Sequence, residues 1–142
     1  MSNIKIIKDK KLVCCYADFT NADLKLVSGS VLNNYRLAYK TFGSLNNNKT
    51  NAILICHALT GDQYVSGQNP MTGREGWWSK MVGPNKPIDT NKFFVICSNV
   101  LGGCAGSTGP KEKKDDGDNI YGLEFPSITI KDMVNAQAKL LD

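Results

Sequence analysis

Two continuous apolar runs constrain the fold of this chain more than any other feature of its sequence. The runs are AILICHAL at residues 52–59 and FFVICSNV at residues 93–100. Uninterrupted apolar runs of this length are typical of strands buried on both faces of a parallel sheet, whereas half-exposed strands alternate apolar and polar residues. The sequence therefore predicts an α/β fold with two parallel strands at these positions.

The segments on either side of these runs predict an antiparallel meander and a helix. Residues 20–45 alternate apolar and polar side chains across two turn signals, which predicts the meander. Residues 128–142 carry an apolar face at helical spacing, and Thr129 and Asp132 predict a capping box at the start of that helix. We expect residues 1–142 to form a single incomplete domain, because an α/β sheet ordinarily adds another strand after such a helix.

Charge and composition exclude several classes of function. The net charge of +4 is mild, and no basic run is interleaved with aromatic residues, which argues against a nucleic-acid partner. No apolar run reaches membrane-spanning length and the N-terminus lacks the apolar core of a signal peptide, so we expect no membrane partner and a cytoplasmic location. The five cysteines have no zinc-binding spacing and are expected to be reduced thiols, with no metal or bound cofactor.

A glycine-rich stretch, NVLGGCAGSTGP at residues 99–110, offers a candidate nucleophile. Within it, GGCAG fits the Gly-x-nucleophile-x-Gly pattern of the elbow in α/β hydrolases, with Cys104 as the nucleophile. The only histidine, His57, and the nearby Asp62 would complete a self-contained triad with this thiol. An elbow must lead directly into a helix, however, and the residues after Cys104 are poor helix formers.

Three longer stretches resemble the homoserine O-acetyltransferase family. They are CHALTGDQ at residues 56–63, GWWSKMVGPNKPIDTNKFFVICSNVLGGCAGSTGP at residues 76–110 and YGLEFPSITIKDMVNAQAKLLD at residues 121–142. The resemblance implies the N-terminal part of an α/β-hydrolase fold, truncated before the nucleophile elbow. It also implies acetyl transfer to L-homoserine in methionine biosynthesis, with acetyl-CoA as a co-substrate.

The resemblance also assigns roles to the candidate residues. In the family the nucleophilic serine and the catalytic Asp and His follow later in the chain, so none is expected up to Asp142 and Cys104 is expected to be structural. The loop HALTG is implied to supply half of the oxyanion hole, with the Leu59 N–H as donor and Thr60 and Gly61 shaping the turn. His57 is then implied to support this loop rather than to act as a base.

Three interpretations of function remain open on the sequence. The first, which we favour, is an N-terminal remnant of an acyltransferase, inactive alone, of the kind that a truncated gene or pseudogene would produce. The second is one half of a split acyltransferase whose missing catalytic groups come from a complementary C-terminal chain. The third is a non-catalytic interaction module that uses an exposed sheet edge. In each of them the homodimer contacts of the family are expected to be missing.

Overall fold

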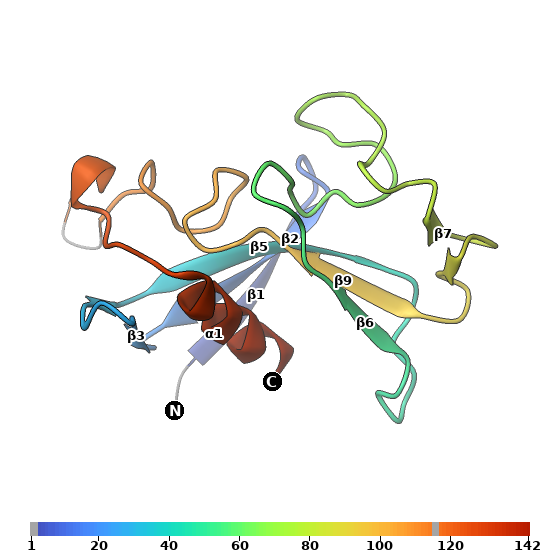
Figure 1. Ribbon diagram of the computed structural model, residues 1–142, viewed down its shortest axis with the longest axis horizontal. Coiled ribbons are helices and arrows are strands. Elements are labelled where there is room, and N and C mark those ends of the chain that lie inside the picture. Colours follow the sequence, from blue (N-terminus) through green and yellow to red (C-terminus); the bar gives the residue numbers. More distant parts are fainter. Residues whose placement is uncertain (1–2, 115–116) are drawn as a thin grey trace. The chain divides into compact units, whose positions relative to one another are not determined.

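The structure, a computed structural model, describes residues 3–114 and 117–142 and contains a mixed sheet (Figure 1). Its strands are hydrogen-bonded in the order β1-β2-β5-β9-β6. Their bounds are Asn3–Asp9 for β1, Cys14–Thr20 for β2, Tyr35–Phe42 for β5, Phe94–Ser98 for β9 and Ala52–Ile55 for β6. Strands β2 and β5, β5 and β9, and β9 and β6 are neighbours although they are not consecutive in the chain. The pair β6 and β9 is parallel, as expected where the chain crosses over between two parallel strands.

The two continuous apolar runs do form a parallel pair. Strands β6 and β9 pair in parallel from Ala52 opposite Phe94 to Ile55 opposite Cys97, while β5 pairs antiparallel with β9. Side chains of these strands enter a core cluster that consists of Ile55, Val65, Val82, Val95 and Cys97. The predicted antiparallel-to-parallel sheet is thus confirmed, although each strand ends before its apolar run does, because the last residues of both runs begin loops.

The chain divides into two compact units, each with its own internal contacts. The first comprises Met1–Ile7, Tyr16–Ala38 and Asn99–Asp142, and the second comprises Lys8–Cys15 and Tyr39–Ser98. Besides its part of the sheet, the second unit contains a short parallel pair, β7 (Val82–Gly83) and β8 (Ile88–Asp89).

The first unit contains the helix α1 (Ile130–Leu141), which lies within the range predicted from the sequence. The predicted capping box is present, because the Thr129 N–H donates to the Asp132 carboxylate at 2.7 Å and the Asp132 N–H donates back to Thr129 Oγ1. The other Asp132 oxygen accepts from the Val27 N–H at 2.9 Å. This bond attaches α1 to the antiparallel hairpin of β3 (Leu24–Lys25) and β4 (Val31–Leu32). A 3-10 helix, η1 (Gly122–Glu124), precedes α1.

The N-terminal strands were not predicted from the sequence. The predicted meander began near residue 20, whereas β1 and β2 already occupy residues 3–9 and 14–20. The described helices include none with the length and apolar character that crossing a membrane requires.

Candidate functional site

The loop that follows β6 forms a tight turn with unused backbone donors. The Gly61 N–H donates to the Ala58 carbonyl at 2.8 Å and closes the turn. A β-carbon on Gly61 would lie 2.8 Å from the β-carbon of His57, so only glycine fits without displacing its neighbours. Within the described part of the chain, no acceptor is found for the N–H groups of Leu59 and Thr60. The turn therefore leaves two adjacent donors for an external acceptor.

His57 is fastened to this same turn. Its Nδ1 lies 2.7 Å from the Ala58 carbonyl oxygen, a contact in which Nδ1 must carry the proton and donate. The Ala58 carbonyl thus accepts from both the histidine ring and the Gly61 N–H. The His57 ring is thus hydrogen-bonded to the backbone of the turn. Support of this loop is the role that the resemblance implies for it.

The other titratable groups near this turn have structural partners. The two carboxylate oxygens of Asp62 accept from the Tyr64 N–H and the Asn69 side-chain amide, each at 2.8 Å. Burial is the main reason that the pKa of the Cys97 thiol is raised to about 12, and the neighbouring Cys56 and Asp62 contribute in the same direction. Cys97 is therefore a thiol and not a thiolate nucleophile at neutral pH.

The glycine-rich loop after β9, in the first unit, is held by its own hydrogen bonds. The Gly102 N–H donates to the Thr108 carbonyl at 2.8 Å, and the Ala105 N–H donates to Asn99 Oδ1 at 3.2 Å. The buried Ser107 hydroxyl donates to the Asn99 carbonyl at 2.7 Å and accepts from the Ala38 N–H at 3.0 Å.

Cys104 lies at the exposed tip of this loop, away from any strand-to-helix turn. Its carbonyl oxygen accepts from Lys111 Nζ at 2.6 Å. Between β9 and η1, which begins at Gly122, the described residues form turns and bends rather than a helix. A nucleophile elbow needs a helix immediately after the nucleophile, so the local backbone does not have elbow geometry.

Comparison with known proteins identifies relatives over most of the chain. No family model matches it. Over 119 residues it is 65% identical to the homoserine O-acetyltransferase of Pelagibacter ubique (strain HTCC1062), a match that covers 84% of this chain and 32% of that enzyme. The chain belongs to the homoserine O-acetyltransferase family as an N-terminal portion. It spans about a third of the length of the relatives that it matches.

Solved structures with the same fold include an acetyltransferase and an esterase. The homoserine O-acetyltransferase of Bacillus anthracis superposes with a TM-score of 0.74 at 28% identity, covering 99% of this chain and 36% of that one. Esterase E22 superposes with a TM-score of 0.75 at 30% identity and the same coverage. The mixed sheet is therefore the N-terminal part of an α/β-hydrolase fold, as predicted.

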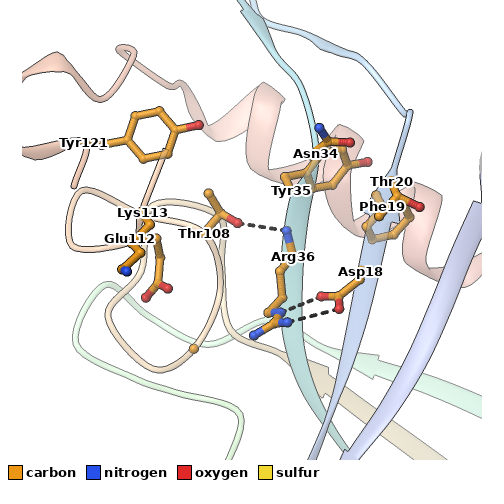
Figure 2. A pocket seen from close by; sticks show the side chains of 11 residues that line it. Asp18, Phe19, Thr20, Asn34, Tyr35, Arg36, Thr108, Glu112, Lys113 and Tyr121 are labelled. Atoms are coloured by element: carbon orange, nitrogen blue, oxygen red, sulfur yellow. Dashed lines mark hydrogen bonds and ion pairs between the residues drawn. The ribbon is translucent and has the colours of Figure 1, made fainter. Parts of the chain in front are cut away.

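The homoserine O-acetyltransferase resemblance gave no role to a cavity of about 340 Å³ in the first unit, which Figure 2 shows. In its wall the Arg36 guanidinium donates to the two carboxylate oxygens of Asp18 at 2.5 and 3.0 Å. The same guanidinium lies 4.8 Å from the Tyr16 ring centroid. The hydrogen bond to Asp18 is the main reason that the pKa of Arg36 is raised. The charges of Arg36 and Asp18 are therefore paired with each other, and the pair links β5 to β2 in the wall of the cavity.

Metal chemistry finds no support in the part of the chain that the structure describes. No group of three or more His, Cys, Asp and Glu side chains there is arranged to hold a metal ion. The five cysteines are all free thiols.

Proposed function

We propose that this chain is the N-terminal part of a homoserine O-acetyltransferase, which transfers an acetyl group from acetyl-CoA to the hydroxyl of L-homoserine in methionine biosynthesis. The 65% identity to the Pelagibacter ubique enzyme supports the reaction class. The contribution that we propose for this chain to the reaction rests on one observation. In the turn after β6, the Leu59 N–H has no acceptor among the described residues.

The proposed contribution of this turn is to stabilise an oxyanion. Attack of a nucleophile on the acetyl carbonyl places negative charge on the carbonyl oxygen, and two aimed N–H groups lower the energy of that state. In the proposal Leu59 supplies one of these donors, while the Gly61 turn and the His57 ring fix its position. Loss of one such donor costs about 2.7–4 kcal/mol of transition-state stabilisation.

The proposal includes the inactivity of the chain by itself. Cys104 lies on a loop without elbow geometry, and the Ser107 hydroxyl is buried and bonded on both sides. The His57 ring is engaged by the turn that it supports. The attacking serine and its Asp and His partners are therefore proposed to lie in the portion of the relatives that this chain does not match.

A second candidate, one half of a split acyltransferase, is favoured by two surfaces. Among the described strands β6 pairs only with β9, so its outer edge is open. The helix α1 exposes Ile130, Val134 and Leu141 at helical spacing. Open parallel edges and apolar helix faces favour association, and a complementary C-terminal chain would cover both. A cytoplasmic location is part of the proposal, supported by the five free thiols.

One experiment tests both candidates by measuring the release of the CoA thiol from acetyl-CoA with homoserine as acceptor. The chain is assayed alone, mixed with the unmatched C-terminal portion of the Pelagibacter ubique enzyme, and fused to that portion. We expect no release by the chain alone and release by the fusion; release by the mixture would identify a split enzyme. A folded fusion without activity contradicts the proposed function. Activity of the chain alone that Cys104→Ala abolishes would instead restore the self-contained triad.

A further inference from the structure

A cavity of about 420 Å³ in the second unit lies apart from the proposed reaction. Its walls are the turn that joins β1 and β2, with residues 8–10 and 13–15, and Lys40 and Thr41 of β5. Three of the lining residues are lysines and one is an aspartate. The Asp9 carboxylate is engaged, because its Oδ1 accepts from the N–H groups of Lys11 and Leu12 at 2.8 and 2.9 Å. Three lysines against one aspartate leave the cavity with a positive charge balance.

Lys40 is the cation that the fold fixes most firmly in this cavity. Its Nζ lies 5.4 Å from the centroid of the Phe42 ring and 5.3 Å from that of the Tyr64 ring. Tyr64 is fully buried, and its hydroxyl donates to the Leu12 carbonyl at 2.7 Å, which links the ring to the β1–β2 turn. Among the described residues no carboxylate forms an ion pair with Lys40. The ammonium is therefore held by ring faces without a counter-charge.

The partial burial of Lys40 makes this lack of a counter-charge costly. Burial lowers the pKa of Lys40, and the nearby Cys14 opposes that effect. An ammonium that leaves water without an anionic partner loses solvation that ring faces replace only in part. A bound anion would supply the missing partner.

One wall of the cavity, formed by Val13, Cys14 and Cys15, is apolar and includes a strained residue. Cys14 is buried and Cys15 is half-buried, so that the wall beside Lys40 carries no competing charge. Val13 stands at the rim with a φ of 50° and with 55% of its surface exposed. A β-branched residue in the left-handed region is unusual, and such strain is concentrated at sites that bind ligands.

We propose that this cavity binds a small carboxylate with an apolar tail, its carboxylate paired with Lys40 and its tail against Val13, Cys14 and Cys15. The inference goes beyond the proposed acyl transfer and does not depend on it. The apolar tail matches the wall of Val13, Cys14 and Cys15, and the anionic head matches the Lys40 ammonium, which has no carboxylate partner among the described residues.

Calorimetric titration of the 142-residue chain with octanoate and with octanol tests this site. Octanol has the same tail without the charge. We therefore expect saturable binding of octanoate, and a Kd for octanol that is at least about tenfold higher. Lys40→Met is expected to weaken octanoate binding about tenfold, whereas Lys40→Arg retains it. Lys80→Met, which removes an exposed lysine of the same unit, is the matched control and is expected to bind as the unaltered chain does.

A second measurement keeps the proposal testable if Lys40→Met fails to fold. Octanoate should shift the amide NMR signals of residues 8–15, 40 and 41 of the unaltered chain, and leave those of α1 in place. Equal binding of octanol and octanoate would overturn the proposal, as would shifts confined to other residues. Equal binding by folded Lys40→Met and Lys80→Met would overturn it as well.

Discussion

The loops that follow the parallel strands β6 and β9 are both glycine-containing, but the loop after β9 is held by more internal hydrogen bonds than the turn after β6. After β9, the N–H groups of Gly102 and Ala105 and the hydroxyl of Ser107 all donate to groups of the same unit. After β6, the turn is closed by the Gly61 N–H, while the N–H groups of Leu59 and Thr60 find no acceptor in the described structure.

This difference separates a structural loop from a candidate catalytic one better than the sequence motif does. A loop held by several internal hydrogen bonds keeps its shape without a ligand, whereas two adjacent donors that have no acceptor in the described structure are available to one. The stretch with Cys104 resembles an active-site motif and is of the first kind. The HALTG turn contains no obvious nucleophile and is the candidate catalytic loop.

The strongest test of the comparison removes one donor from the β6 loop. In the fusion with the C-terminal portion of the Pelagibacter ubique enzyme, Leu59→Pro is expected to lower kcat about 10²–10³-fold, because proline has no N–H. Leu59→Ala keeps the N–H and replaces a side chain that is 94% exposed, so its kcat should match that of the parent. A folded Leu59→Pro fusion with undiminished kcat would contradict the assignment of Leu59 as a donor.

A substitution in the loop after β9 should change the free energy of unfolding rather than kcat. Ser107→Ala leaves the Ala38 N–H and the Asn99 carbonyl buried without the partner that the hydroxyl provided. We expect the free energy of unfolding in urea to fall by about 2–3 kcal/mol. Ser44→Ala, at an exposed serine, serves as the control and is expected to change it by less than about 0.5 kcal/mol.

The Val27 N–H is a backbone donor whose acceptor, the Asp132 carboxylate, is distant in the sequence. Burial by itself would raise the pKa of this carboxyl, but hydrogen bonds from Thr129 and Val27 outweigh burial and lower it. Asp132→Asn is therefore expected to reduce the free energy of unfolding by about 1–2 kcal/mol at pH 7.

The pH dependence of the Asp132 effect has a definite sign. A carboxyl with a lowered pKa in the folded state stabilises above its unfolded pKa of about 3.9, and the contribution is lost as the pH falls through the folded value. Urea unfolding at pH 7 and at pH 3 should therefore show a smaller difference between the two proteins at the lower pH. A difference that grows on acidification would rule out this carboxylate as the source.

The smallest effect is expected at Cys104. Its side chain is exposed, and the hydrogen bond at this residue uses the main-chain carbonyl, which Cys104→Ala retains. The free energy of unfolding should change by less than about 0.5 kcal/mol, and kcat of the fusion should not change. A large loss of activity would mean that the two loops have been assigned the wrong way round.

The sequence predicted those parts of the fold that are local patterns. The apolar runs of β6 and β9 and the capping box of α1 each depend on residues within one segment, and each is present. The hairpin of β1 and β2 was missed, because Ile4 and Ile6 of the first strand are exposed and the strand shows little contrast between its faces. The aromatic residues Tyr16 and Phe19, which are buried in β2 and favour strands, are the signal that was available.

The parts of the site that could not be predicted depend on contacts between distant residues. The bond from Val27 to Asp132 joins residues 105 apart, and that from Ala38 to Ser107 joins residues 69 apart. No local motif encodes either bond. The role of Leu59 came only from the family resemblance, since the availability of a backbone N–H is a property of the folded turn and not of the residue type.

The burial of Cys97 within β9 gives the molecule an internal reporter of its own opening. A thiol with a pKa of about 12 and no exposed surface reacts with alkylating agents only when its strand separates from its neighbours. Cys56 and Cys104 are exposed and should be labelled at once. The delay between the labelling of these thiols and that of Cys97 then records how often β9 separates from its neighbours β5 and β6.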